Sequence, residues 1–572
     1  MRGLIGQNLS YLKPFAGRIL IDAAKQGETP VVTPAGLRWE VIAKGTPEGF
    51  NGDYDLFADE RFNVSITGGS PASLLIHAAV GAEVAQRFTV KMAAKPGQTA
   101  QLHLLFPGRT KLPKGIRLIR PGYTFEQAAQ QVWTNEYLDL LRKLNAGTLR
   151  FMDAQRINGS EVTDRWLEPE FALWSVKGMG CPLAPLFDLA QLVNADPWVC
   201  VPAKATDGWV RRAAKEATIG LTCRGTPRRC IVEYGNELWN NGNESFKLAW
   251  QYTVDQGAAV GLTNRQWAAK RASEVAAIFV EEFTAAGMAD LLVPVLCGAT
   301  NDSGVLGDML LYLKGKPNPF KALAVAGYFG APRTAKNADE VFAGLTDSAK
   351  ALHAGKQMQK FNAQVASGPY EKFIYEWSPS IETGVAGLPA VVNTDPRIAD
   401  SVRAWGAGWD GGPACHFCAI ADFGGAGWAA TDAVEKFTPK CAALAEISAA
   451  KPMITATDLL KKQIMELTGQ LATQDEYVVA LEKENGSLTN RIIAAERDAK
   501  AATDRYAILE ASWKNSKLEI ERLQADLALA RSDSDAAHAN LAATVLAAGK
   551  VQGELNRAND TLLKIQIAGG WK

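Results

Sequence analysis

The chain has 572 residues, of which 47% are hydrophobic, so it is long enough for several domains with a sizeable core. Lys plus Arg and Asp plus Glu both number 61, and this balance excludes a global charge that would attract nucleic acid or an anionic membrane. Residues 1–17 lack the apolar run of a signal peptide, and no stretch of about 18 apolar residues occurs, so we expect neither a secretory signal nor a membrane span. The protein is expected to be made in the cytosol and to stay there, or to leave by a route without a signal.

The cysteines and histidines form no recognisable cofactor pattern. Eight cysteines are scattered, and none of the five histidines belongs to an HExxH motif or a His/Cys cluster. Cys415 and Cys418 stand three residues apart, but no second CxxC pair follows them. We therefore expect buried core cysteines, no metal ion and no other cofactor.

The N-terminal part contains two different patterns. Residues 3–10, GLIGQNLS, are predicted to be the first strand of a barrel, within an N-terminal segment 1–30. Residues 31–122 contain short β segments bounded by Gly, Pro and Asn, with the spacing of a small sandwich. We interpret them as a β-rich domain inserted between the first barrel strand and its helix. Glycan binding, coverage of the barrel bottom and contact with a partner are all compatible with this pattern.

From residue 123 to residue 450, helical stretches alternate with short apolar runs. Seven runs are predicted to be strands, at 148–153, 196–202, 230–237, 291–298, 322–330, 372–378 and 414–420. With the first strand they make eight alternating β and α units, which favour an α/β fold of the (β/α)8 TIM-barrel type. An open doubly wound sheet is the competing fold. It would be expected to carry a Gly-rich nucleotide turn after an early strand, and the sequence has none there.

The C-terminal region has a heptad pattern. No proline follows Pro452, and residues at positions a and d of a seven-residue repeat are mainly apolar from Ile464 onwards. The repeat exceeds the three or four heptads that indicate a coiled coil, so we predict one over 455–567, with oligomerisation through heptads 464–565. Asn485 at an a position is typical of a device that sets register and oligomeric state. A helical hairpin with bends at Gly486 and Gly549 is the alternative.

In a (β/α)8 barrel, the functional groups lie at the C-terminal ends of the strands. Here these ends carry carboxylates, aromatic rings, an amide and an arginine, but no phosphate-binding loop. The residues are Arg150, Asp153, Trp198, Asn236, Glu237, Tyr328, Glu376, Trp377 and, after the last strand, Trp428. Aromatic faces beside hydrogen-bonding groups suit sugars. Two carboxyl groups suit cleavage of a glycosidic bond, one as the proton donor and the other as the anion. The fourth and seventh strands lie across the barrel mouth, so Glu237 and Glu376 are expected to face each other.

The segments VEYGNELWN and FIYEWS resemble the corresponding strand ends of the retaining glycoside hydrolases of clan A. The resemblance covers roughly residues 1–450 and implies that Glu237 is the acid/base and Glu376 the nucleophile. It also implies that Asn236 binds the sugar 2-hydroxyl, that Tyr328 donates to the nucleophile, and that Arg150 keeps it ionised. Asp153, Trp198, Trp377 and Trp428 complete the predicted substrate-binding set, with packing at the barrel top as the other interpretation of Tyr328 and Trp198.

Two functional hypotheses follow. The first is a retaining glycoside hydrolase that acts on a poly- or oligosaccharide, for example as a depolymerase attached to a virion through the coiled coil. The second is a non-catalytic carbohydrate-binding or structural protein, such as a bacteriophage tail or fibre component with other tail proteins as partners. A cytosolic assembly factor that acts mainly through the coiled coil is a third and weaker interpretation.

Overall fold

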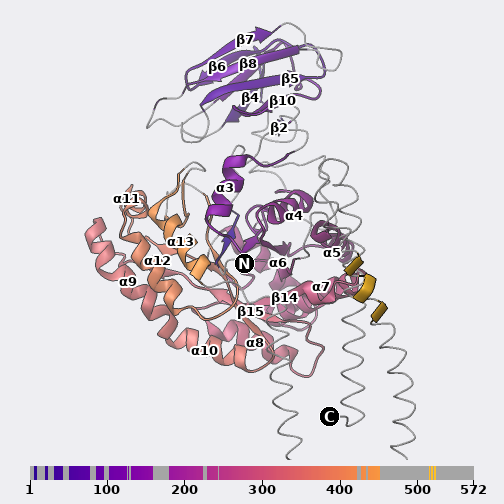
Figure 1. Ribbon diagram of the computed structural model, residues 1–572, viewed down its shortest axis with the longest axis vertical. Coiled ribbons are helices and arrows are strands. Elements are labelled where there is room, and N and C mark those ends of the chain that lie inside the picture. The colour runs from indigo at the N-terminus through magenta and orange to yellow at the C-terminus, as the bar shows by residue number, and fades with distance from the viewer. Residues whose placement is uncertain are drawn as a thin grey trace, which may run out of the picture. The chain divides into compact units, whose positions relative to one another are not determined.

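The computed structural model describes residues 5–450 with gaps, and a few residues between 514 and 522 (Figure 1). The gaps are residues 10–19, 23–30, 43–50, 78–85, 94, 96–101, 125–126, 128–130, 159–179, 223–227, 243, 421–426 and 433–435. Contacts divide the chain into two units, Met1–Met453 and Ile454–Lys572. The predicted coiled coil at 455–567 therefore lies almost entirely outside the described residues and stays a prediction.

Eight parallel strands close into a barrel, which confirms the predicted (β/α)8 architecture. Their order around the barrel follows the chain: β1 (Ile5–Asn8), β11 (Thr148–Arg150), β12 (Asp196–Val201), β13 (Cys230–Tyr234), β14 (Leu292–Cys297), β15 (Ala322–Ala326), β17 (Glu371–Trp377) and β19 (Ala414–His416). Seven lie within the segments predicted from apolar runs, and β17 begins one residue before its predicted segment, at Glu371. The barrel closes where β1 pairs with both β11 and β19.

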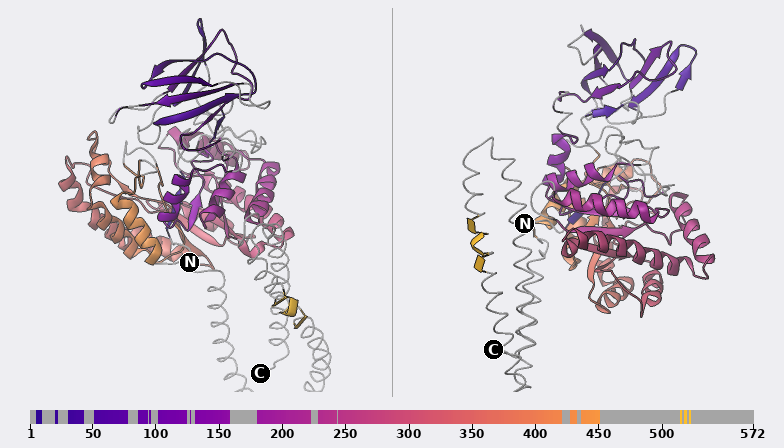
Figure 2. Two further views of the ribbon diagram at one scale, coloured as in Figure 1. Left: turned by 45° about the horizontal axis from the view of Figure 1, so that its top comes forward. Right: turned by 90° about the vertical axis from the view of Figure 1, so that its right-hand side faces the viewer.

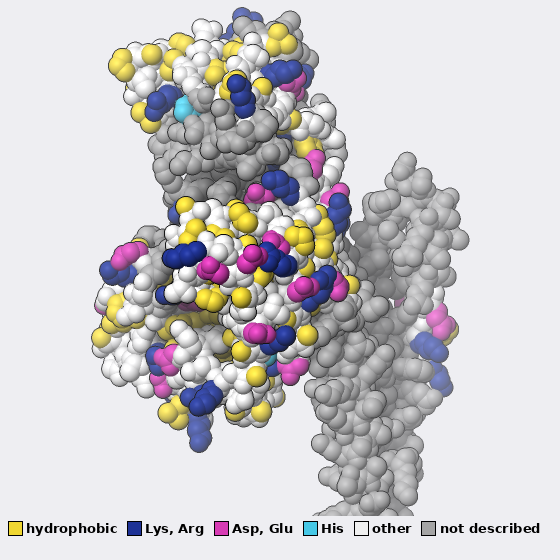
Figure 3. All heavy atoms as spheres, turned by 90° about the vertical axis from the view of Figure 1, so that its left-hand side faces the viewer, with side chains coloured by type: hydrophobic (Ala, Val, Ile, Leu, Met, Phe, Trp, Pro, Cys, Tyr) yellow, Lys and Arg dark blue, Asp and Glu magenta, His cyan; other side chains and the backbone are white. Residues whose placement is uncertain are grey.

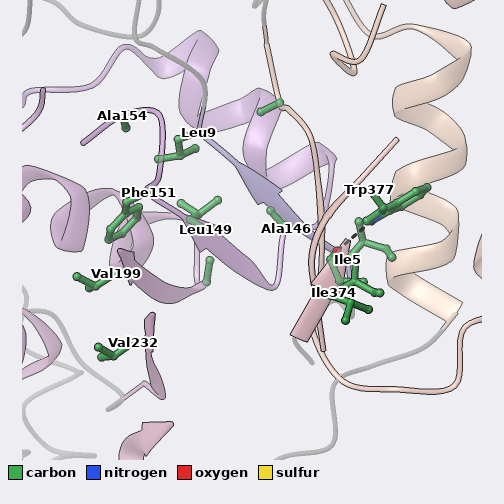
Figure 4. Close-up of a cluster of buried hydrophobic side chains, with 14 of the residues drawn as sticks. Ile5, Leu9, Ala146, Leu149, Phe151, Ala154, Val199, Val232, Ile374 and Trp377 are labelled. Carbon is green, nitrogen blue, oxygen red and sulfur yellow. Dashed lines mark hydrogen bonds between the residues drawn. The ribbon is translucent and has the colours of Figure 1, made fainter. Parts of the chain in front are cut away.

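Side chains alternate between the barrel interior and the helical shell, as the two-residue period of a strand requires. In β12, Trp198 and Cys200 belong to the interior cluster, whereas Val199 and Val201 belong to the cluster beneath the helices. The same alternation places Ile231 inside and Val232 outside in β13. Figure 4 shows the outer cluster near the barrel closure, where side chains from the first, second and seventh barrel strands lie together. This register decides which residues of each strand can reach the site.

The helices follow the strands in sequence and surround the barrel (Figures 1 and 2). They are α3 (Asn135–Lys143), α4 (Leu183–Leu192), α5 (Asp207–Thr222), α6 (Glu244–Ala258), α7 (Asn264–Ala285), α8 (Ser303–Leu313), α9 (Ala338–Ala354), α10 (Lys356–Ala366), α11 (Leu388–Thr394), α12 (Ile398–Gly408) and α13 (Pro439–Ala450), with a 3-10 turn η2 (Ala289–Leu291). Helix α7 starts with a capping box between Thr263 and Gln266, which satisfies the first backbone N–H groups. No helix among the described ranges is long and apolar enough to cross a membrane.

The described residues between Leu20 and Ile119 form two antiparallel sheets. One has the order β2 (Leu20–Asp22), β10 (Arg117–Ile119), β5 (Gly52–Ala58), β8 (Gln86–Met92), β7 (Ala72–His77), and the other β3 (Val31–Thr33), β4 (Gly36–Ile42), β9 (Leu102–Pro107), β6 (Ser65–Gly69). They enclose a core of their own, which includes Trp39, Tyr54 and Phe106. A short pair, β16 (Phe329–Gly330) and β18 (Pro379–Ser380), follows barrel strands β15 and β17. The domain boundaries at residues 30, 122 and 450 stay predictions.

The outer surface agrees with the balanced composition. Basic and acidic side chains lie next to one another on the face shown in Figure 3. Elsewhere in the described part of the chain, charged side chains form ion pairs, such as Arg265 with both Asp302 (2.6 Å) and Asp308 (2.8 Å). Exposed pairs of this kind contribute little to stability, so the fold depends mainly on its apolar clusters.

Gly6 of β1 is required by the barrel interior. A Cβ atom at this position would lie 2.7 Å from Cys415 Sγ and 3.0 Å from Thr148 Cβ. We expect Gly6→Ala to lower the free energy of unfolding by about 1–3 kcal/mol because it overpacks the interior, and Cys415→Ala to restore part of the loss. Gly208→Ala is the matched control, since its Cβ would meet only Thr206 Oγ1 at 3.8 Å. Urea unfolding checks the prediction, and equal stability of the two variants would contradict it.

Candidate active site

The side chain of Arg150 occupies the centre of the site, inside the barrel. Its Nε and Nη2 donate to the two carboxylate oxygens of Glu233, each at 2.8 Å. Nη1 donates to Glu376 Oε1 at 2.7 Å, and Nη2 also donates to Asn236 Oδ1 at 2.7 Å. The guanidinium is fully buried, and the two carboxylates beside it raise its pKa against the effect of burial. Arg150 therefore stays charged and joins strands β11, β13 and β17.

Glu376 lies at the end of β17 and receives two donors. Arg150 reaches one carboxylate oxygen, and the Tyr328 hydroxyl donates to the other at 2.9 Å. The register of β17 with β19 shifts between Ile374 and Trp377, which is a β-bulge or a similar irregularity. A bulge turns side chains away from strict alternation. We attribute to it the finding that Tyr375 and Glu376, although consecutive, both reach the site.

Glu237 lies in a tight turn after β13. Gly235 has φ +71°, and a Cβ there would lie within 2.8 Å of three Leu238 side-chain atoms, so only glycine fits. Glu237 itself has φ +44°, an uncommon backbone conformation for a residue with a long side chain. Its carboxylate accepts hydrogen bonds from Tyr375 Oη at 2.9 Å and Asn240 Nδ2 at 2.8 Å. The turn therefore directs Glu237 toward the seventh strand.

The two glutamates interact electrostatically. Burial raises the pKa of Glu376 from 4.5 to about 8, Arg150 opposes this shift, and the charges of Glu237 and Asp153 add to it. Burial also raises the pKa of Asp153, to about 7, again against Arg150. Groups that interact in this way lose their protons in coupled steps. The site thus contains more carboxyl groups than it can ionise at neutral pH.

The predicted residues fall into two groups in the structure. Arg150, Asn236, Tyr328 and Glu376 are joined by the hydrogen bonds above, and Glu237 and Asp153 lie close enough to affect the pKa values of Glu376 and Tyr328. Asn236 is buried, and its amide nitrogen donates to Asn158 Oδ1 at 3.1 Å. In the structure, Asn236 therefore also braces Arg150, a contact that the sequence did not predict.

Two of the predicted sugar-contacting rings lie elsewhere. Trp198 is fully buried in the barrel interior, where its Nε1 donates to Glu233 at 2.9 Å. Trp377 is fully buried in the outer cluster, where its ring stacks on Trp405 with centroids 3.6 Å apart (Figure 4). Neither ring presents a face to solvent, so we correct their assignment from sugar contacts to packing residues. Strand alternation and the shift in β17 account for both positions.

Trp428 lies beside the site with part of its ring exposed. Its side chain is 38% exposed, and its ring centroid lies 6.2 Å from that of Tyr328 and 5.9 Å from that of Phe417. Since Tyr328 donates to Glu376, the Tyr328 ring lies between Trp428 and the Glu376 carboxylate in this chain of contacts. It is the predicted aromatic residue best placed to present a face to a ligand.

The sequence did not predict three residues of the site. Glu233 accepts two of the hydrogen bonds that Arg150 donates, Tyr375 donates to Glu237, and Asn240 donates to the same carboxylate. The signal for Glu233 was available, because it lies two residues after Ile231 and therefore on the interior face of β13. Tyr375 could be assigned only with the register of β17 in hand.

Arg150→Met should destabilise the protein strongly. It leaves Glu233 and Glu376 buried without their shared cation, and loss of one partner of a buried ion pair costs about 3–5 kcal/mol. The double variant Arg150→Met/Glu233→Met should recover a large part of this loss, because it also removes an unpaired carboxylate. Urea unfolding measures the free energy of unfolding of both variants. A double variant no more stable than Arg150→Met would contradict the assignment of Arg150 as the cation that pairs with Glu233.

Glu376→Gln should change how stability depends on pH. The folded protein holds the Glu376 proton more tightly than the unfolded chain, because the pKa rises from 4.5 to about 8 on folding. The stability from this group is therefore complete below pH 4.5 and is lost as the pH rises toward 8. We expect the free energy of unfolding of the wild type, relative to Glu376→Gln, to fall across this interval. Glu281→Gln on the exposed surface controls for loss of a carboxylate, and a difference independent of pH would contradict the prediction.

Comparisons with known proteins do not place the chain in a family. No protein-family model and no curated protein matches the chain. Among solved structures, 22 chains match, including a native Bacteroidetes-affiliated GH5 cellulase linked with a polysaccharide utilization locus. That match has 12% sequence identity and a TM-score of 0.30, and covers 59% of this chain and 89% of the cellulase chain. We therefore base the function on the geometry of the site itself.

Proposed function

We propose that the protein is a retaining glycoside hydrolase that acts on a poly- or oligosaccharide through Glu237 and Glu376. The observation that carries the proposal is the arrangement of these two carboxyl groups. They come from the fourth and seventh barrel strands, each accepts two side-chain hydrogen bonds, and their charges interact. Paired carboxyl groups at a barrel mouth are the chemical requirement of double displacement.

The donors around each carboxyl group assign the roles. Glu376 accepts from a guanidinium and a phenol. Burial raises its pKa to about 8, and the charge of Arg150 opposes that shift and so favours the anion that a nucleophile needs. Glu237 accepts from a phenol and an amide, which are both neutral, and it is more exposed. We therefore assign Glu376 as the nucleophile and Glu237 as the acid/base.

The reaction then has two steps. Glu237 gives its proton to the glycosidic oxygen while Glu376 forms a bond to the anomeric carbon, and the leaving sugar departs as an alcohol. Glu237, now an anion, takes a proton from a water molecule, whose oxygen displaces Glu376 from the anomeric carbon. Atoms and protons balance, and both carboxyl groups return to their starting states. Arg150 stabilises Glu376 whenever that group is an anion.

Sugar binding is assigned to the residues beside the pair. The partly exposed Trp428 ring would stack on the C–H face of a sugar, and Asn236, Tyr328 and Asp153 would pair with hydroxyl groups. The proposal extends to oligomerisation through heptads 464–565 and to attachment of the enzyme to a virion, where it would depolymerise a polysaccharide. These last two parts rest on the heptad sequence alone.

Variants of the two glutamates test the proposal. The probes are a panel of cellulose, xylan, mannan, chitin and bacterial capsular polysaccharides, and aryl glycosides of the corresponding oligosaccharides. Glu376→Gly should lose about 10³-fold or more in cleavage of every active substrate. Glu237→Ala should lose cleavage of polysaccharides but retain cleavage of aryl glycosides, since a phenolate leaves without a proton.

Added azide separates the two roles. Azide that replaces the Glu376 carboxylate should give a glycosyl azide of inverted configuration, whereas azide that attacks the intermediate of Glu237→Ala should give the retained configuration. NMR of the products reads the configuration. Unchanged activity of Glu376→Gly, or the same configuration from both variants, would overturn the mechanism. Glycan binding by the wild type without turnover of any probe would favour the carbohydrate-binding alternative.

A further inference from the structure

Lys440 is a fully buried cation that the proposed mechanism does not use. It is the second residue of α13, and its three N–H groups lie within hydrogen-bond distance of four oxygens. The acceptors are Trp428 O at 2.8 Å, Asn393 Oδ1 at 3.0 Å, Ser378 Oγ at 3.2 Å and Gly427 O at 3.2 Å. All four are neutral oxygens, and no carboxylate of the described residues forms an ion pair with this lysine.

This position is energetically unfavourable for an ammonium group. Burial lowers the pKa of Lys440 from 10.5 to about 7, which reflects the loss of hydration of the cation. The N-terminal turn of a helix also carries a partial positive charge, which repels a cation. The nearby His416 adds no like charge, because burial, and then Lys440 itself, lower its pKa and keep it neutral. Hydrophobic packing would stabilise the fold at lower cost, so the hydrogen bonds of Lys440 call for a functional explanation.

The hydrogen bonds of Lys440 converge on the backbone that carries Trp428. The carbonyl of Trp428 accepts from Lys440 and also from Ser378 Oγ at 2.7 Å. Gly427 is pressed against α11, since a Cβ there would lie 2.2 Å from Asn393 Nδ2, and its φ is +65°. At the other end of the residue, Trp428 Nε1 donates to Ser380 Oγ at 3.2 Å. Both the backbone and the indole of Trp428 are therefore fixed by hydrogen bonds.

We propose that Lys440 is a positioning residue for sugar binding, which acts by holding the carbonyl groups of Gly427 and Trp428 so that the Trp428 ring stays beside Tyr328. The inference rests on the proposed function, because it assigns the Trp428 ring as the sugar platform. Ser378 links the two parts of the site, since it is two residues from Glu376 and donates to the same carbonyl. Lys440 thus fixes the distance between the platform and the nucleophile without touching either the sugar or the reacting atoms.

Lys440→Met tests the inference, because methionine has a similar length but no donor. Kinetics on the panel polysaccharide that the wild type cleaves fastest should show KM raised about five- to tenfold, the range of a lost ring contact, with kcat within about twofold. In a Trp428→Ala background, Lys440→Met should have no further effect on KM. If Lys440 had only a structural role, Lys440→Met would instead change kcat and KM together, and to the same extent with and without Trp428.

The matched control is Ser448→Ala on the same helix. Ser448 is also fully buried, and its hydroxyl donates to Asn145 O at 2.7 Å and accepts from Ile5 N at 3.3 Å, away from Trp428. The variant Ser448→Ala should lower the stability of the protein without changing KM. Lys440→Gln, which keeps an amide donor, serves as a second and milder variant if Lys440→Met does not fold, and should give an intermediate KM.

A second readout does not need turnover. In protein labelled with 5-fluorotryptophan, the ¹⁹F resonance of Trp428, identified by its loss in Trp428→Phe, should shift in Lys440→Met and Lys440→Gln but not in Ser448→Ala. If the wild type cleaves no probe and the resonance still shifts, the proposed function fails while Lys440 keeps its positioning role. An unchanged resonance, an unchanged KM, or a KM effect that persists in the Trp428→Ala background would overturn the inference.

Discussion

The shared contacts of one buried guanidinium organise this barrel mouth. Arg150 binds Glu233 with two hydrogen bonds and Glu376 with one, so a single cation serves two buried anions. Because Glu233 also accepts from Trp198, its geometry is fixed independently of Glu376. Glu233 therefore acts as the anchor that orients Arg150, and Arg150 in turn orients the carboxylate of the seventh strand. An ion pair that is costly to bury becomes useful when it positions a third charged group.

The site has more buried carboxyl groups than buried cations, which makes Arg150 the central charge of the site. Arg150 acts on the carboxyl groups of Glu233, Glu376 and Asp153, and burial makes each further anion less favourable. A proton must therefore be held among these groups at neutral pH. Double displacement needs the same balance, with one carboxyl group protonated and the other ionised. The proposed mechanism therefore depends on Arg150, the buried cation beside Glu376, which opposes the effect of burial on the pKa of that group.

The barrel and the two glutamates were predictable from the sequence because they depend on short-range patterns. Apolar runs separated by helical periods give the eight strands, and a carboxylate at the end of a buried strand has few structural reasons to be there. Trp198 and Trp377 were assigned wrongly because aromatic type and strand position do not say which face a ring occupies. The shift between β17 and β19 changes that face, and it arises from pairing between strands, which no single strand encodes.

Lys440 shows the limit of local reasoning most clearly. In the sequence TPKCAALAEI it looks like an ordinary lysine in the first turn of an amphipathic helix, where it would be solvated. Its burial depends on contacts with three other segments, at Ser378, Asn393 and residues 427–428, which lie up to 62 residues away. Arg150 has carboxyl partners and sets charge, whereas Lys440, among the residues that the structure describes, contacts only neutral oxygens and can set only position.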